Sequence, residues 1–174
     1  MSDDLNAVSL HPDPSDRQDR ADRLDRLDRR ILATLQANGR ISNQELAQAV
    51  HLSPAQCNRR HRRLESLGYI QGYEARLDRE RLGLGVTAFV HVSMERGQHK
   101  EVLRFQQTMA KLPEILECHA VTGDFDYVCK VVARDLKSLS DFLLGTLARL
   151  DGVSSVRSSI CLNELKSTHA LPLE

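Results

Sequence analysis

The sequence has few aromatic residues and lacks the patterns that build membrane spans, zinc sites and disulfide frameworks. It has no tryptophan, three tyrosines and four phenylalanines. Its four cysteines are scattered without C-x-x-C spacing, which argues against a zinc site and a disulfide scaffold. No run approaches the ~18 to 20 apolar residues of a transmembrane helix, and the N-terminus lacks the apolar core of a signal peptide. We therefore expect no membrane partner, no metal, no cofactor and a reducing, cytoplasmic location.

An excess of charge of one sign is also missing, because 24 basic side chains balance 24 acidic ones. A neutral chain does not coat nucleic acid indiscriminately, although it can carry local basic patches. Such a patch lies between Arg40 and Leu67, where five arginines stand against two glutamates. This local excess is the electrostatic footprint expected of a specific DNA contact.

The segment from Ser42 to Ile70 predicts two short helices joined by a tight turn. Ser42 and Glu45 form a capping box that starts the first helix just after Ser42. The buried stripe of this helix consists of Leu46, Ala47 and Val50. Ser53 and Pro54 open the second helix as N-cap and first-turn proline, after a turn of about three residues. This arrangement predicts a helix-turn-helix.

The second helix has two different faces. One face is apolar and consists of Cys57, His61 and Leu64, with Leu67 at its margin. The other is polar and consists of Asn58, Arg59, Arg62 and Ser66, flanked by Arg63. In the major groove of DNA, arginine pairs with guanine and asparagine with adenine, while further arginines hold phosphates. The alternative is a merely solvated arginine face, but the capped helix pair favours DNA. The predicted contacts to double-stranded DNA are Ser53, Ala55, Gln56, Asn58, Arg59, Arg60, Arg62 and Arg63.

Residues 1–23 are expected to form a mobile, charged N-terminal tail. An Asp-Arg pair recurs every three residues from Asp16 to Arg30. We interpret this tract as a solvated helical extension rather than a DNA-contacting arm. A further helix packs behind the helix-turn-helix and ends at Asn38-Gly39. Its stripe consists of Leu24, Leu27, Ile31 and Leu35.

Alternation over residues 69–77 predicts one or two short strands, so that the DNA-binding domain, 24–77, is a winged variant. The charged residues 78–85 form a linker. The rest, 86–174, alternates between strand and helix patterns. The expected strands are 86–94, 115–122, 127–133 and 153–162, and the expected helices are 99–112 and 136–150. This βαββαβ order predicts a ferredoxin-like domain, and the fold class is α+β.

Both faces of the predicted sheet carry apolar residues, for example Ile115 and Val121 on one face against Leu116 and Ala120 on the other. The face without helices needs a cover, and the same face of a second copy provides one with two-fold symmetry. We therefore expect a homodimer. A dimer also lets two recognition helices address successive major grooves.

Several motifs resemble those of the Lrp/AsnC transcription regulators, the leucine-responsive and asparagine-type family of bacteria and archaea. They are L-D-R-R-I-L-x-x-L-Q-x-N-G-R-I-S-N-x-E-L-A from Leu27, L-S-P-x-x-C-x-x-R from Leu52, R-L-E-x-x-G-Y-I-x-G-Y from Arg63 and E-C-H-A-V-T-G-D-F-D-Y from Glu117. The last is closer to the leucine-responsive branch. The resemblance implies a DNA-binding domain, an effector domain that takes amino acids, and dimers that assemble into tetramers or octamers.

Two residues depart from the pattern of that family. His51 occupies a turn position usually held by glycine, and histidine tolerates a left-handed backbone better than most residues. His61 replaces a valine that faces the core. We interpret it as a half-buried, hydrogen-bonded histidine rather than a pH sensor or a DNA contact.

The loop 122–126, T-G-D-F-D, is the second functional signal. Asp124 and Asp126 can accept hydrogen bonds from the ammonium group of a free amino acid, and the N–H groups of a glycine-containing turn can hold its carboxylate. Taken alone, the loop fits an ordinary surface hairpin turn. With the resemblance, it predicts a site for leucine or methionine. The predicted effector-binding residues are Leu116, Cys118, Ala120, Thr122, Gly123, Asp124 and Asp126.

A two-residue turn at Gly123-Asp124 would place residues opposite each other when their numbers sum to 247, which pairs Cys118 with Cys129. We expect two reduced thiols packed as small apolar groups, with a redox switch as the alternative.

Two other classes of function compete with the DNA-binding regulator. An enzyme would need a convergent acid, base or nucleophile, and His91, His99 and His119 have neither metal spacing nor a partner motif. We therefore predict no catalytic residue. A helix-turn-helix can also serve protein interaction, but only DNA binding weakens steeply with salt.

Overall fold

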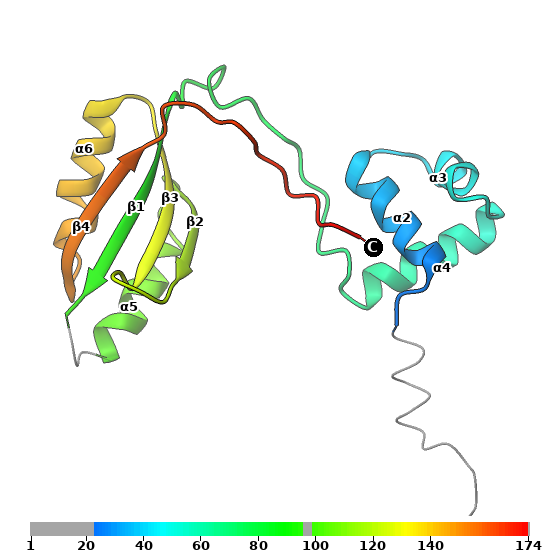
Figure 1. Ribbon diagram of the computed structural model, residues 1–174, viewed down its shortest axis with the longest axis horizontal. Coiled ribbons are helices and arrows are strands. Elements are labelled where there is room, and N and C mark those ends of the chain that lie inside the picture. Colours follow the sequence, from blue (N-terminus) through cyan, green and yellow to red (C-terminus); the bar gives the residue numbers. More distant parts are fainter. Residues whose placement is uncertain (1–22, 96–98, 174) are drawn as a thin grey trace, which may run out of the picture. The chain divides into compact units, whose positions relative to one another are not determined.

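The computed structural model describes residues 23–95 and 99–173 of the chain, with side chains described outside 96–100. These residues form two compact units (Figure 1). One is built from 23–75 together with 168–173, and the other is Arg76–Ser167. The tail predicted at 1–23 lies outside the described residues except for Arg23.

The first unit is a bundle of three helices, α2 (Arg26–Ala37), α3 (Asn43–Val50) and α4 (Pro54–Ser66). The predicted capping box and N-cap are confirmed, since the Ser42 and Ser53 side chains each accept a backbone N–H at the start of a helix. His51 ends α3 in the predicted left-handed conformation, with φ 57°. The core consists of Ile31, Leu32, Leu35, Leu46, Ala47, Val50, Cys57 and Leu64.

The strands predicted at 69–77 do not form. A strand needs a neighbour for its backbone hydrogen bonds, and no described segment pairs with this one. The segment is instead held by Tyr73, whose hydroxyl lies 2.5 Å from His61 Nε2 and donates to Glu65 at 3.1 Å. His61 is therefore half-buried and hydrogen-bonded, as predicted.

Residues 168–173 pack with the first unit and not with the domain predicted at 86–174. The Gln36 amide donates to the Leu171 carbonyl at 3.1 Å and accepts from the Leu171 N–H at 2.6 Å. Leu173 lies against the core of the three helices. No sequence pattern indicated this return, because the segment has neither a helix nor a strand pattern.

The second unit also differs from its predicted limits, because it begins at Arg76 rather than after the linker. The Arg76 side chain donates to the Ser167 carbonyl, and Arg79 pairs with Glu164 at 2.5 Å. These contacts hold the start of the unit beside its end.

The second unit has the predicted βαββαβ order. Its elements are β1 (Val86–Met94), α5 (His99–Met109), β2 (Ile115–Ala120), β3 (Tyr127–Ala133), α6 (Leu136–Gly145), the 3-10 helix η1 (Leu147–Arg149) and β4 (Val153–Ile160). The sheet is antiparallel with strand order β2-β3-β1-β4. The leucine spacing predicted one helix as far as Leu150, but α6 ends at Gly145, a residue that loses more backbone entropy in a helix than any other.

Helices α5 and α6 cover one face of the sheet (Figure 1). The core there consists of Ala88, Val90, Val92, Phe105, Met109, Tyr127, Cys129, Val131, Ala133, Leu139, Phe142 and Leu147. The alternate residues of β1, Phe89 and His91 among them, point to the other face, which we call the open face. Phe89 is 43% exposed there.

A bulge in β2 changes which side chains share a face. It lies between Ile115 and Glu117, so that Ile115 pairs with Val131 while Ala120 pairs with Tyr127. Both partners are buried in the core. Ile115 and Ala120 are therefore on the same face, and the strict alternation that we predicted for this strand is wrong.

Candidate DNA-binding helix and effector loop

Helix α4 presents a basic surface to solvent. Arg59 and Arg62 are exposed and make no ion pair with the described residues. They lie one turn apart on the same side of the helix. The other exposed members of the predicted DNA-contacting set are Ser53, Ala55, Gln56 and Asn58. This side can enter a groove without disturbing the core.

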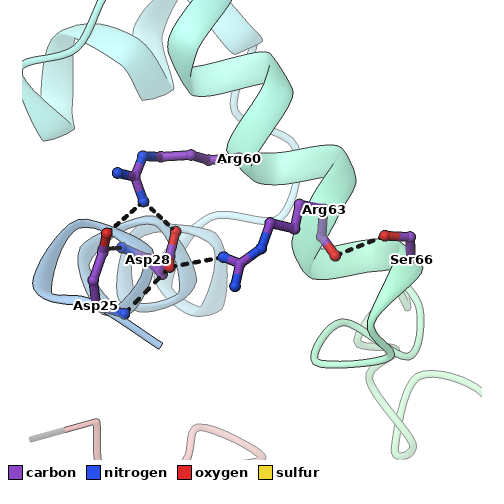
Figure 2. A network of polar contacts seen from close by, with 5 residues as sticks. All are labelled: Asp25, Asp28, Arg60, Arg63 and Ser66. Carbon is purple, nitrogen blue, oxygen red and sulfur yellow. Dashed lines mark hydrogen bonds and ion pairs between the residues drawn. The ribbon is translucent and has the colours of Figure 1, made fainter. Parts of the chain in front are cut away.

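Arg60 and Arg63 have a different environment, because both reach back to α2 (Figure 2). Arg60 Nη1 lies 2.8 Å from Asp28 and 2.7 Å from Asp25, and Arg63 Nη1 lies 3.1 Å from Asp28. Asp28 is only 1% exposed, so it is a buried carboxylate held by two guanidinium groups. We call these four residues the Asp28 network.

The Asp28 network fixes α4 on α2. The Arg60 side chain donates hydrogen bonds to Asp28 and to Asp25. These bonds raise the pKa of Arg60, the bond to Asp28 most of all. Burial opposes ionisation of Asp25, but hydrogen bonds from the Asp28 N–H and from Arg60 lower its pKa. The two carboxylates also cap α2, since each accepts the backbone N–H of the other. One group of side chains therefore starts α2 and orients the exposed arginines of α4.

The sequence analysis did not predict that Asp28 is a buried ion-pair partner. Asp28 lies on the same helical stripe as Ile31, Leu32 and Leu35, all of which are buried. A carboxylate on an apolar stripe must find cationic partners. The position of Asp28 on this stripe could have indicated a buried ion pair. Asp28 also belongs to the recurring Asp-Arg pairs, however, and these were interpreted together as solvated.

The loop 122–126, the candidate effector loop, is wider than the two-residue turn predicted at Gly123-Asp124. The Val121 N–H donates to the Asp126 carbonyl at 3.0 Å, which leaves four residues in the turn. The predicted register is nevertheless confirmed, with Cys118 opposite Cys129 and Ala120 opposite Tyr127. Gly123 has φ 126°, a conformation that strongly favours glycine.

The two carboxylates of the loop are not equivalent. Asp124 is exposed. Asp126 accepts the Met94 N–H at 2.7 Å through one carboxylate oxygen, and its own N–H donates to the Val92 carbonyl at 3.1 Å. Asp126 therefore anchors the loop to β1, and Asp124 is the carboxylate that is free to meet a ligand.

Phe125 places the loop against the open face. Its ring lies 4.6 Å from that of His91, and the Arg157 guanidinium lies 5.7 Å from its centre. The sequence reasoning missed these three residues, because nothing in it showed that the loop folds over the sheet.

The other predicted effector residues do not gather beside Phe125. Cys118 and Ala120 share the side of the sheet that faces the helices, since their partners Cys129 and Tyr127 do. Leu116 lies in the bulge and is exposed. Within one chain, the predicted set is thus divided between the two faces.

A groove of about 520 Å³ lies elsewhere, between α6 and β4. It is lined mainly by leucines, serines and β-branched residues, without a charged side chain. Such a groove can take an apolar chain, but it offers no charged partner to the ammonium and carboxylate groups of an amino acid.

Two further features are absent from the described ranges, 23–95 and 99–173. None of the helices there is long and apolar enough to cross a membrane. No cluster of three or more histidine, cysteine, aspartate or glutamate side chains there could hold a metal ion.

Comparison with known proteins agrees with this division into two functional parts. Residues 24–71 match the model of a winged helix-turn-helix DNA-binding domain, and residues 87–171 match the Lrp/AsnC ligand-binding domain. The leucine-responsive regulatory protein of Escherichia coli (strain K12) is 43% identical over 144 residues, which are 83% of this chain and 88% of the relative.

Two solved structures are similar over most of the chain. A transcriptional regulator from Neisseria meningitidis, in complex with L-Met, has 40% identity and a TM-score of 0.84, covering 87% of this chain and 97% of its own. An AsnC family transcriptional regulator from Agrobacterium tumefaciens has 32% identity and a TM-score of 0.82, covering 86% and 97%.

A helix-turn-helix that matches the winged DNA-binding model, joined to a ligand-binding βαββαβ domain, defines a class of ligand-responsive transcription regulators. The chain belongs to the Lrp/AsnC family of transcriptional regulators. The predicted fold class and the predicted function as a DNA-binding regulator are confirmed.

Proposed function

We propose that a small apolar amino acid, with leucine and methionine as the first candidates, controls DNA binding from the loop 122–126 in an assembly of several copies. The observation that carries this proposal is that two suitable groups are adjacent in the loop: the exposed carboxylate of Asp124 and the exposed backbone of Gly123. A carboxylate suits the ammonium group of the ligand, and backbone N–H groups suit its carboxylate. The Neisseria meningitidis relative in complex with L-Met supports the same class of ligand.

A complete pocket at the loop needs a second chain. Gly123 and Asp124 are exposed within one chain, and no atom lies within 4 Å of the position of a Cβ at Gly123. An apolar wall for the ligand side chain can come from Leu116, or from a neighbouring copy seated against the open face. We place the site where subunits meet for this reason.

In this proposal, Arg59 and Arg62 of α4 form the surface that recognises DNA. They are assisted by Ser53, Ala55, Gln56 and Asn58. Arg60 and Arg63 act through the Asp28 network by holding the helix. DNA as the partner also favours a cytoplasmic location.

Because the loop and α4 belong to different compact units, the effect of the ligand on DNA is indirect. The ligand must favour one assembly state, or one placement of the DNA-binding units, over another. Allosteric couplings of this kind are typically about 1 to 3 kcal/mol.

Titration calorimetry with leucine and methionine tests the effector site. We expect wild-type protein to bind at least one of them and Asp124→Ala to lose binding, because the ammonium group loses its charged partner. Glu80→Ala removes another exposed carboxylate, near the opposite end of β1 where Arg79 bonds to Thr87, and should bind normally. DNA binding without effector should be similar in all three proteins. Equal binding by wild type and Asp124→Ala would move the site elsewhere, and no binding by wild type would refute the effector proposal.

The open face supports self-association, because it carries Phe89 and is not covered by either helix. The unit Arg76–Ser167 should therefore form at least a dimer at micromolar concentration in light scattering. Phe89→Lys in this unit should weaken assembly, because it places a charge in the buried interface.

Leu103→Lys is the matched control for that experiment, since Leu103 is 61% exposed but lies on α5 rather than on the sheet. It should leave assembly unchanged. A monomeric wild-type unit would contradict pairing through the open face.

A further inference from the structure

Cys118 and Cys129 are directly opposite each other on β2 and β3, and their Sγ atoms are 3.2 Å apart. Both thiols are free. The Val121 N–H bonds to the Asp126 carbonyl and the Val132 N–H to the Glu114 carbonyl, so the even-numbered residues of β3 direct their backbone groups toward β2. Cys129 is odd-numbered, and the two kinds of pair alternate along an antiparallel ladder, so Cys118 and Cys129 form a non-hydrogen-bonded pair.

This type of pair brings side chains closest together. Its Cα atoms lie about 4.5 Å apart, and disulfides occur at Cα separations of about 4.4 to 6.8 Å. The two cysteines can therefore be joined without moving the strands apart or together. Hydrogen-bonded pairs are less favourable for a disulfide, because their side chains are farther apart.

The two thiols differ in access and acidity. Cys118 is partly exposed on β2, which is an edge strand, whereas Cys129 is fully buried. The hydrogen bond that Cys129 donates lowers the pKa of Cys118 to about 7 and raises the pKa of Cys129. Cys118 is thus the sulfur that an external reagent can reach and that ionises first.

We propose that Cys118 and Cys129 are an oxidisable thiol pair, which a hydroperoxide converts to an intrachain disulfide. The Cys118 thiolate attacks the peroxide oxygen, the O–O bond breaks, and Cys118 becomes a sulfenic acid as hydroxide or alkoxide leaves and takes up a proton. The Cys129 sulfur then attacks the Cys118 sulfur. The S–O bond breaks, and the hydroxyl leaves as water with the proton of Cys129.

The atoms and electrons balance in this sequence. Two thiols lose two protons and two electrons in total, and one hydroperoxide takes them up to give water and an alcohol or a second water. The second step is favoured by a change in charge, because a sulfenic acid is neutral and no longer opposes ionisation of Cys129 as the thiolate does.

The other two cysteines do not share these features. Cys57 is buried in the core of the three helices, and burial raises its pKa. Cys161 follows β4 and has no cysteine opposite it. The disulfide between Cys118 and Cys129 would close the hairpin that carries the loop 122–126, although the redox chemistry does not depend on the amino-acid site.

The test uses the full chain with Cys57→Ser and Cys161→Ser, treated with hydrogen peroxide and then denatured in iodoacetamide. Intact mass should show the loss of two hydrogen atoms without alkylation, and a non-reducing gel should show a single chain. Dithiothreitol should restore two alkylatable thiols. Peptide mapping of oxidised wild-type protein gives the same test without the serine substitutions, in case Cys57→Ser disturbs the core.

Single substitutions separate the roles of the two sulfurs. Cys129→Ser should leave a sulfenic acid on Cys118 that dimedone traps, and Cys118→Ser should leave Cys129 unreactive in the folded protein. The proposal is overturned if both thiols can still be alkylated when the folded chain is treated with peroxide and then denatured, or if Cys118 is oxidised to sulfinic acid without a disulfide.

Discussion

Asp28→Asn is expected to destabilise the helical unit by about 2 to 4 kcal/mol, somewhat less than the about 3 to 5 kcal/mol typical of breaking a buried ion pair. The substitution keeps the size of the side chain but removes the charge that holds Arg60 and Arg63. It also presents an amide N–H group to two guanidinium groups that can only donate. The cost stays below the upper limit because these arginines are 25% and 32% exposed and can partly return to water.

Hydrogen exchange of the backbone amides of α2, α3 and α4 measures this effect, because it reports the stability of the unit separately from the rest of the chain. Asp25→Asn is the matched control. Asp25 is 50% exposed, and asparagine caps a helix as well as aspartate, so its effect should stay below about 1 kcal/mol. Similar exchange in wild type and Asp28→Asn would show that the network does not stabilise the unit.

Arg59→Ala and Arg62→Ala should each weaken specific DNA binding by about 1 to 3 kcal/mol, or about 5- to 150-fold, without changing stability. Both side chains are exposed and unpaired among the described residues, so their removal leaves the core intact. An arginine that reads a base should relax specificity at one position when it is removed. An arginine on a phosphate should instead lower the slope of log affinity against log salt by about 0.9.

The DNA for this experiment is a duplex that the wild-type protein selects from a random pool, and affinity is measured over a series of salt concentrations. Arg104→Ala removes the same charge from an exposed position on α5 and should have no effect. Arg60→Ala should lose both stability and DNA affinity, which distinguishes a positioning residue from a contacting one. Unchanged affinity in both Arg59→Ala and Arg62→Ala would show that the recognition surface lies elsewhere.

Local signals predicted the elements that depend on local physics. Ser42 and Ser53 mark helix starts through their own backbone contacts, and β1 and β3 have the predicted limits. The position of the turn predicted that Cys118 pairs with Cys129, and this pairing is confirmed. The turn is wider than predicted, but it widens by one residue on each side, which leaves the register unchanged.

The missed features depend on partners that are distant in sequence. The sequence analysis included Arg60 with Arg59 and Arg62 among the DNA contacts, but only the position of Asp28 on α2 decides that Arg60 turns inward. The bulge in β2 could not be read from alternation, since it is defined by the neighbouring strand. Phe125 looked like one residue of a polar turn, and its contact with His91 arises only when β1 lies beside β3.

The return of residues 168–173 to the helical unit has a consequence for the order of synthesis. A ribosome makes these residues only after it has made all of Arg76–Ser167, although the three helices emerge much earlier. Domains generally begin to fold from the N-terminal side while the chain is still growing. The nascent helices therefore lack the contacts of Leu171 and Leu173 until the regulatory part exists. The packing of the DNA-binding part is therefore completed only after the whole of Arg76–Ser167 has been translated.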